Sequence, residues 1–446
     1  MSKNRLEDIT ALAKRRGFVY QGSEVYGGLA GTWDYGPLGV QLKRNIQNLW
    51  WSTFVEQRDD MYGVDAAILM NPKVWQASGH TGAGFADPMV EDLENKKRYR
   101  ADHLLEDAGV DPLGMTLADM QQTIIDKDIK SPDGNELGEV RQFNMMFQTH
   151  AGPIQDDNSK VYLRPETAQG MFVNFKNVVD SLQPDFPFGL AQIGKAFRNE
   201  ISPREFVFRT REFEQMEIEY FVREDNWEEV FDQWREQFYE WFDLVGIDKS
   251  KISELDVVGD DLAHYSKKTI DFEYDFSFGR KELYGLAYRT DHDLRNHQEH
   301  SGKSMEYITK DTQEKIIPHC IEPTFGVERT VLAILDSAYT EDTENKRVYL
   351  KLAESIAPVR YAVSPLLKNK PELVDKAREV YKMLQAKYGR VVWDDNGNIG
   401  KRYRRQDEIG TPWCVVIDFD TLEKDGKVSI RNRDTLEQTR LKPEEI

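Results

Sequence analysis

Residues 190–221 constrain the fold more than any other stretch, because two alternating segments flank a charged loop there. Residues 190–199 and 210–221 each alternate apolar and polar side chains, a pattern that predicts two β-strands. The intervening residues 201–209 include Pro203 and several charges, which interrupt the alternation. We therefore expect an antiparallel hairpin with a long, positively charged loop.

The second segment has no ordinary core face. A period of two places Phe213, Gln215, Glu217 and Glu219 on one face, and it places Glu212, Glu214, Met216, Ile218 and Tyr220 on the other. Burying a carboxylate is costly unless it meets a cation or a ligand. The pattern therefore indicates either a binding site or a structural ladder of ion pairs across the strands, and the hairpin alone leaves both interpretations open.

The residues around this loop carry a family resemblance. Phe197-Arg198-Asn199-Glu200 and Arg209-Thr210-Arg211-Glu212-Phe213 resemble motif 2 of class II aminoacyl-tRNA synthetases, and residues 322–329, EPTFGVER, resemble motif 3. The segments RPETAQG at 164–170 and REFEQMEIEYF at 211–221 are similar to those of the homodimeric glycyl-tRNA synthetases, a family of subclass IIa. The resemblance extends from about residue 16 to the end of the chain.

The resemblance implies an α+β fold, in which a class II antiparallel sheet is flanked by helices and followed by a mixed α/β anticodon-binding domain. We expect a catalytic domain at 1–71 and 141–356, an inserted helical subdomain at 72–140, and the anticodon-binding domain at 357–446. The patterns agree, since residues 269–279 alternate strictly and the segment after residue 358 alternates predicted strands with helices.

The resemblance also assigns the nucleotide site. Arg198, Arg209 and Arg329 are the implied catalytic residues, because arginine grips phosphate oxygens with two donors and stays charged. Phe213 would stack on adenine, and Glu282 would bind Mg²⁺ beside the phosphates. The full set implied for ATP is Arg198, Asn199, Glu200, Phe208, Arg209, Thr210, Arg211, Glu212, Phe213, Glu282, Leu283, Gly326, Val327, Glu328 and Arg329.

A second set is implied for the amino acid. Glu166 and Glu217 would bind the ammonium of glycine, with help from Glu322. Thr324 stands where the family usually has Ser, so the hydroxyl is kept while an added methyl narrows the site. The full set is Arg100, Glu166, Phe213, Glu214, Gln215, Met216, Glu217, Glu322, Pro323, Thr324, Phe325 and Gly326.

Composition restricts the partners and the compartment. The chain of 446 residues has a formal net charge of −19, which argues against a general nucleic-acid binder. Residues 357–446 nevertheless carry 18 Lys and Arg against 15 Asp and Glu, a net charge of +3, so the other residues carry −22. Cys320 and Cys414 are the only cysteines, which excludes a disulfide framework. We expect a cytoplasmic protein without a membrane segment, and the resemblance implies that it is an enzyme whose partners are tRNA(Gly), glycine and ATP.

Other segments leave alternatives open. The apolar helix that begins at Pro37 is either buried or, as the resemblance implies for motif 1, part of a homodimer interface. Residues 79–85, GHTGAGF, do not follow a strand and lack the Lys-Ser/Thr ending of a phosphate loop. The basic run 401–405 is either a solvated helix face or an RNA contact.

Two rival functions remain at this stage. One is another class IIa synthetase, for threonine, proline or histidine, although the chain lacks a Cys/His zinc set of the kind expected for threonine. The other is a non-catalytic, synthetase-like binding subunit. The presence of Arg198, Arg209, Phe213 and Arg329 argues against this second rival, because such a subunit has no need to bind phosphate groups.

Overall fold

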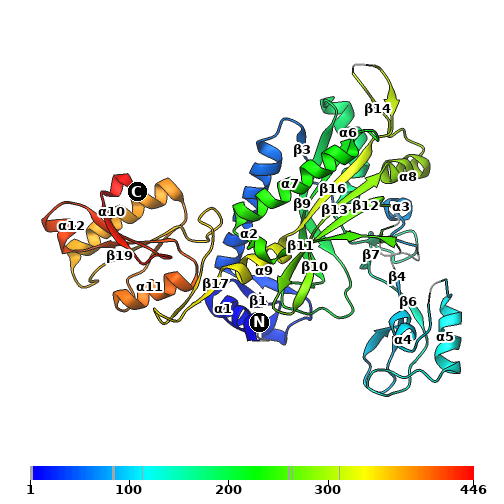
Figure 1. Cartoon of the computed structure of the whole chain (residues 1–446), viewed down its shortest axis with the longest axis horizontal. Helices are drawn as coiled ribbons and strands as arrows, with labels where there is room; N and C mark the ends of the chain where they lie inside the picture. Colours follow the sequence, from blue (N-terminus) through cyan, green and yellow to red (C-terminus); the bar gives the residue numbers. More distant parts are fainter. Residues whose placement is uncertain (1–3, 83–85, 113, 260–261, 264, 311) are drawn as a thin grey trace.

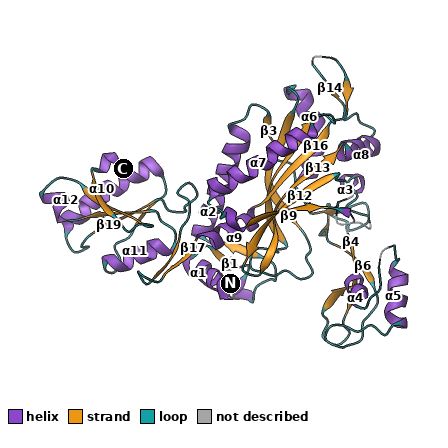
Figure 2. Cartoon of the chain, in the orientation of Figure 1, coloured by secondary structure: helices purple, strands orange, loops and turns teal. Residues whose placement is uncertain are grey.

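The computed structural model describes residues 4–82, 86–112, 114–259, 262–263, 265–310 and 312–446. A body built on one large sheet lies in the middle, a small subdomain hangs from one side, and the C-terminal domain lies on the other side (Figure 1). Figure 2 shows that helices and strands are mixed in all three parts. This arrangement is the α+β fold that the sequence predicts.

The central sheet has seven strands in the order β11-β12-β13-β16-β10-β9-β3. All neighbours are antiparallel except the edge pair β3 and β9, which is parallel. The strands are β3 (Met61–Gly63), β9 (Phe188–Phe197), β10 (Glu212–Val222), β11 (Ile252–Val257), β12 (Lys268–Phe276), β13 (Gly279–Thr290) and β16 (His319–Gly326).

The predicted hairpin is confirmed as β9 and β10, with Glu212 opposite Phe197 where the strands meet the loop. The loop is longer than expected and covers residues 198–211. The Arg198 amide still donates to the carbonyl of Arg211 at 2.9 Å, but the Glu200 amide turns back to the carbonyl of Arg198. The loop then pairs with itself, because Arg204 and Arg209 form an isolated bridge.

One face of the sheet is covered by helices α2 (Pro37–Trp51), α7 (Trp227–Val245) and α9 (Val327–Ala338), with α1 (Asn4–Arg16) beside α9. Met216, Phe272 and Phe325 of the sheet are fully buried in the resulting core. The aromatic side chains of α7 lie in this core, and the helix ends at Gly246, whose φ of 72° suits glycine. Burial of this apolar area is the main stabilising term of the body.

The apolar side of α2 lies inside its own chain. Ile46, Trp50 and Phe54 are at most 2% exposed, and Phe54 lies in a π-helical extension, Ser52–Glu56. The Asn45 amide donates to the carbonyls of Ile356 and Ala357 at 2.9 and 3.0 Å. The interpretation as a buried helix is therefore confirmed for these residues, so they supply no free surface for a partner.

The opposite face of the sheet is covered only in part. Helices α6 (Ala168–Leu182) and α8 (His292–Ser301) pack around Phe188, Leu190 and Phe221, and α3 (Pro72–Ala77) packs against α8. These helices cover the end of the sheet where β10 ends and β9 begins. The middle of this face carries the candidate site.

The inserted subdomain contains a sheet that the sequence did not predict, and one of its strands lies beyond the expected boundary at residue 140. Strands β4 (Ala86–Glu91), β5 (Arg98–Arg100) and β6 (Arg141–Asn144) pair in the order β5-β4-β6, beside the expected short helices α4 (Ala101–Asp107) and α5 (Leu117–Asp126). The expectation of a helical subdomain was therefore incomplete. Three- to six-residue strands rich in charge do not show the alternation by which strands are recognised.

The C-terminal sheet has the order β20-β19-β21-β22-β23, and only its first three strands are parallel. Helices α10 (Pro371–Tyr388), α11 (Ile399–Glu408) and α12 (Phe419–Glu423) complete the domain. Its strands are β19 (Tyr361–Pro365), β20 (Val391–Trp393), β21 (Trp413–Ile417), β22 (Val428–Asn432) and β23 (Gln438–Leu441). The predicted mixed α/β order is confirmed, although the sequence predicted neither β23 nor α12.

Four small hairpins complete the described chain: β1 (Val19–Gln21) with β2 (Trp33–Tyr35), β7 (Gln148–His150) with β8 (Lys160–Tyr162), β14 (Tyr307–Ile308) with β15 (Lys315–Ile316), and β17 (Tyr339–Asp342) with β18 (Arg347–Leu350). Among the helices in the described ranges, none combines the length and apolar character needed to span a lipid bilayer.

Candidate active site

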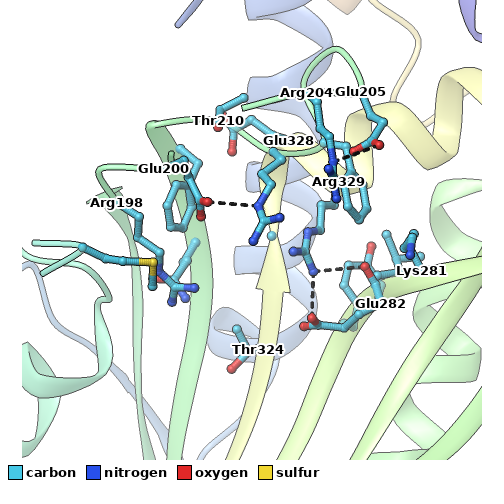
Figure 3. A pocket seen from close by; sticks show the side chains of 18 residues that line it. Arg198, Glu200, Arg204, Glu205, Thr210, Lys281, Glu282, Thr324, Glu328 and Arg329 are labelled. Atoms are coloured by element: carbon cyan, nitrogen blue, oxygen red, sulfur yellow. Dashed lines mark hydrogen bonds and ion pairs between the residues drawn. The ribbon is translucent and has the colours of Figure 1, made fainter. Parts of the chain in front are cut away.

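A cavity of about 460 Å³ opens on the partly covered face of the central sheet. Strands β10, β13 and β16 form its floor, and the 198–211 loop and the start of α9 form its walls (Figure 3). Its size is in the range of small-molecule sites. It is lined by Met145, Arg198, Glu200, Arg204, Glu205, Phe208, Arg209, Thr210, Phe213, Gln215, Lys281, Glu282, Leu283, Tyr284, Thr324, Gly326, Glu328 and Arg329.

Three predicted arginines from separate segments meet in this cavity. Arg198 follows β9, Arg209 ends the loop, and Arg329 lies in the first turn of α9. The Arg209 Nε lies 3.0 Å from Glu200 Oε2, and an Arg329 Nη lies 3.1 Å from Glu282 Oε2 (Figure 3). Both arginine side chains stay partly exposed, at 45% and 30%. They are therefore held in place while keeping donors for a ligand.

Aromatic rings lie beside two of these guanidinium groups. The Arg198 guanidinium carbon is 5.4 Å from the ring centre of Phe213, and that of Arg329 is 4.6 Å from the ring centre of Phe208. Phe208 is held edge-on by Phe276 and Phe278, each with its ring centre 5.3 Å away. A cavity lined by guanidinium groups and flat rings suits an anionic ligand that carries an aromatic base.

Several residues of the predicted set have side chains outside the cavity. Glu214 accepts from Lys43 of α2 at 2.6 Å, Glu212 pairs with Lys195, and Met216 is buried in the core. Phe325 and Val327 are also fully buried core residues. For the strand residues the reason is alternation, because consecutive residues of β10 and β16 point to opposite faces, whereas Val327 is the first residue of α9 and is buried in the core. Their side chains do not take part in the site.

Three more corrections concern the edges of the site. Arg211 turns away, and it donates to the carbonyls of Glu200 and Ala30 at 3.1 and 2.9 Å. Arg100 ends β5 in the inserted subdomain, where it pairs with Asp102 at 2.5 Å and does not line the cavity. Asn199 and Pro323 belong to the adjoining backbone, but neither lines the cavity.

Buried carboxylates lie directly behind Thr324. Glu217 accepts from the Thr324 hydroxyl at 3.1 Å and from the Gln215 amide at 3.2 Å, and it also bonds the hydroxyl of Thr167. Glu322 accepts from Arg289 at 2.8 Å. Single carboxylate oxygens of Glu217, Glu219 and Glu322 lie within 4.8 Å of one another.

Glu166 joins this acidic group through Gln169. The Gln169 amide nitrogen donates to Glu166 at 3.1 Å and to Asp293 at 2.9 Å. Asp293 and Glu322 are both bound by Arg289, so Glu166 and Glu322 belong to one network, and Glu217 lies beside it with a carboxylate oxygen within 4.8 Å of one of Glu322. All three are less than 9% exposed.

The residue that organises this network was missed in the sequence. Arg289 is 1% exposed, it grips Asp293 with two nitrogens at 2.8 and 2.9 Å, and it reaches Glu322 with the third. Its guanidinium also lies 3.8 Å from the ring centre of Tyr265. The i,i+4 spacing of Arg289 and Asp293 was the available signal. A second signal in the sequence was the position of Glu219, which lies on the same strand face as Glu217.

The electrostatics of the network favour a cation. Burial raises the pKa of Glu322 to about 8 against the attraction of Arg289. Burial and repulsion from Glu166 raise the pKa of Glu217, and burial and Glu322 raise that of Glu219 well above its usual range. Burial also opposes ionisation of Glu166, but His80 and Arg289 outweigh it and lower its pKa. An ammonium group would relieve this crowding of carboxylates.

The basic run 401–405 of the C-terminal domain is mostly structural. Arg402 is 3% exposed and donates to the carbonyls of Pro365 and Gly397. Arg405 pairs with Asp394 at 2.7 Å. Lys401 and Arg404 are the members of the run that are exposed, so the expected RNA contact is reduced to these two side chains.

The comparisons with known proteins agree with this fold. Residues 147–338 match the family described as "tRNA synthetase class II core domain (G, H, P, S and T)", and residues 361–446 match "Anticodon binding domain". Together with the antiparallel sheet and the arginine-lined cavity, these matches define a class II aminoacyl-tRNA synthetase.

Curated relatives narrow the assignment. The chain is 49% identical to the glycine--tRNA ligase of Geobacillus thermodenitrificans, over 98% of this chain and 95% of the relative. It is 48% identical to that of Acetivibrio thermocellus and 49% identical to that of Caldanaerobacter subterraneus, in both cases over 100% of this chain and 97% of the relative. The chain belongs to the glycine--tRNA ligase family.

Proposed function

We propose that this chain attaches glycine to tRNA(Gly) in two steps. Glycine and ATP first form glycyl-adenylate and pyrophosphate, and the glycyl group is then transferred to the tRNA with release of AMP. The observation that carries the proposal is the junction of two sites: a cavity with Arg198, Arg209 and Arg329, and a buried set of carboxylates directly behind Thr324. The family relationship supports the same reaction.

Activation requires the glycine carboxylate to attack the α-phosphorus of ATP. Arg198, the first residue of the loop, lines the cavity beside Phe213 and would hold the carboxylate and the α-phosphate together, while Arg209 and Arg329 would bind the outer phosphates. Positioning and fixed positive charge supply the rate enhancement, because a carboxylate needs no general base to act as the nucleophile.

Recognition of glycine depends on its ammonium and on the absence of a side chain. Glu166, Glu217 and Glu322 would share the ammonium, and Thr324 would limit the space beside the α-carbon. Binding energy alone separates substrates that differ by one methylene by roughly 10 to 200 fold, so steric exclusion has to contribute.

Magnesium fits beside Glu282. This carboxylate lies at the rim of the cavity with one oxygen on Arg329, and burial together with Glu282 and Glu273 raises the pKa of the nearby Asp271 to about 7. Such an excess of negative charge suits a hard divalent cation that binds few carboxylates and the oxygens of a phosphate. When bound, Mg²⁺ would neutralise charge on the phosphates. Arg198, Arg209 and Arg329 would still orient the triphosphate.

The homodimer that the sequence suggested is supported by a different element than α2. In the β1–β2 hairpin, Val25 is 89% exposed, Tyr26 is 92% exposed and Leu29 is 55% exposed. Neighbouring exposed apolar side chains at the tip of a hairpin are typical of a contact surface. We propose that a second copy of this chain covers this tip.

The C-terminal domain would bind the anticodon arm, with Lys401 and Arg404 as candidate phosphate contacts. The subdomain built on strands β4, β5 and β6 has no proposed role. We infer a cytoplasmic location from the reaction, since glycyl-tRNA is used by ribosomes.

The test is ATP–pyrophosphate exchange with a panel of amino acids. The expected result is exchange with glycine and little exchange with alanine, serine, threonine, proline or histidine. Exchange with another amino acid would favour a different class IIa synthetase. No exchange with any amino acid would favour a non-catalytic binding subunit.

A further inference from the structure

His80 is buried against the proposed ammonium site, although the sequence pattern assigned its segment no function. It follows α3 and is 6% exposed, and residues 83–85 of the same glycine-rich segment lie outside the described residues. The positive φ of Gly79, 81°, allows the tight turn that precedes His80.

The imidazole of His80 is held from two sides. Its ring packs edge-on against the fully buried Trp75, with ring centres 5.4 Å apart. The Ser78 hydroxyl oxygen lies 2.8 Å from His80 Nδ1. The other nitrogen, Nε2, lies 3.4 Å from the carboxylate of Glu166.

This geometry defines where the proton of the ring lies. The neutral Nδ1–H tautomer would set the Nε2 lone pair against the Glu166 carboxylate, which is repulsive. This favours two other states: the neutral ring with its proton on Nε2 and Ser78 donating to Nδ1, and the ring protonated on both nitrogens. In both cases Nε2–H faces Glu166. The second oxygen of Glu166 accepts from Gln169 at 3.1 Å, so the carboxylate is fixed at both ends.

We propose that His80 is a positioning residue for glycine: its Nε2–H orients the Glu166 carboxylate toward the substrate ammonium. This inference rests on the proposed function and deepens it. His80 acts through Glu166 and has no proposed contact with ATP, since it does not line the arginine cavity. The attraction of His80, which lowers the pKa of Glu166 against the effect of burial, supports the assignment.

The test compares His80→Leu with His80→Gln. Leucine removes the donor and glutamine keeps an N–H donor of similar reach. Loss of a hydrogen bond to a charged group weakens binding by roughly 10- to 100-fold. His80→Leu should therefore raise the KM for glycine in pyrophosphate exchange by about that factor. The KM for ATP should change less than about twofold, and His80→Gln should restore most of the loss. His300→Leu, an exposed histidine on α8, is the control for loss of an imidazole.

A pair of adenylate analogues separates positioning from general damage. Glycyl-sulfamoyl-adenosine carries the ammonium, and acetyl-sulfamoyl-adenosine lacks it. Titration calorimetry should show that His80→Leu lowers the affinity for glycyl-sulfamoyl-adenosine about tenfold or more. The affinity for acetyl-sulfamoyl-adenosine should fall less than about threefold. Equal weakening of both, or a parallel rise in the KM for ATP, would overturn the proposal.

A double-mutant cycle tests the route through Glu166. In a Glu166→Gln background, His80→Leu should raise the KM for glycine by less than about a further threefold, because the carboxylate that His80 orients is gone. A full additional loss would contradict the proposal.

If His80→Leu fails to fold, Ser78→Ala replaces it, with an expected rise in the KM for glycine of about two- to fivefold. No rise would count against the inference. Failure of the proposed function would look different, because the unmodified chain would then show no exchange that depends on glycine.

Discussion

Thr324 and Glu217 face each other across strands β16 and β10, and the Thr324 hydroxyl donates to the Glu217 carboxylate at 3.1 Å. The threonine thus joins the arginine cavity to the buried carboxylates, because its hydroxyl points to Glu217 while it also lines the cavity. Its methyl group is the part that differs from the serine usual in this family.

Removal of that methyl group should loosen amino-acid selection. Thr324→Ser keeps the hydroxyl bond to Glu217, so we expect the KM for glycine to stay within about twofold. Exchange with alanine should rise by up to about tenfold, because one methyl in a tight site contributes roughly that much discrimination. Exchange assays with both amino acids measure the ratio. An unchanged ratio would show that other groups exclude alanine.

Glu217→Gln should lower the affinity for glycine without a similar effect on the affinity for ATP. The substitution removes a charge that would bind the ammonium, so the affinity for glycine should fall by roughly 10 to 100 fold. ATP binding should change little, since the arginine cavity remains intact. Titration calorimetry with each ligand alone measures both affinities, and equal losses for both would contradict the assignment.

Arg329→Ala should abolish pyrophosphate exchange. The side chain bonds the carboxylate and the backbone carbonyl of Glu282 at the cavity rim, and with Arg209 it would supply positive charge to the outer phosphates. A fall in kcat/KM for ATP of about a hundredfold or more is expected. Arg295→Ala, on the exposed surface of α8, should behave like the unmodified chain. Retained exchange in Arg329→Ala would exclude the proposed role.

Glycine affinity should depend on pH. Glu322 has a pKa of about 8, and the pKa of Glu217 is also raised, so the free site takes up protons as the pH falls below about 8. An ammonium competes with those protons. The KM for glycine should therefore rise between pH 8 and pH 6, by up to about tenfold per unit for each proton displaced, while the KM for ATP stays nearly flat. A KM for glycine that is constant over this range would contradict the account.

Tyr26→Glu should weaken the proposed dimer. A charge on this 92% exposed side chain would repel its counterpart if a second copy covers the hairpin tip. Sedimentation velocity over a range of concentrations should show a shift from dimer to monomer. Ile125→Glu, on the inserted subdomain and 60% exposed, is the control. A dimer that persists in Tyr26→Glu would assign the interface to another surface.

Much of the fold could be predicted because alternation and helical periodicity are local signals. The β9–β10 hairpin, the strand β12 and the aromatic helix α7 follow directly from them. The inserted sheet β5-β4-β6 could not be predicted, since its short charged strands are held by pairing between distant segments.

The site was predicted only in part, because the sequence carries its local motifs and not its contacts between distant segments. Motif resemblance identified Arg198, Arg209 and Arg329, but it also included Glu214 and Met216, which strand alternation places on the opposite face. Arg289 and His80 were missed because their importance comes from contacts with residues far away in the chain, Glu322 and Glu166. Those contacts exist only in the folded protein.

A crystal structure with glycine and a non-hydrolysable ATP analogue tests the central claim most directly. The account predicts the triphosphate within hydrogen-bond distance of Arg198, Arg209 and Arg329, and the glycine ammonium between Glu166, Glu217 and Glu322. A nucleotide bound elsewhere, or an ammonium out of reach of these three carboxylates, would contradict it.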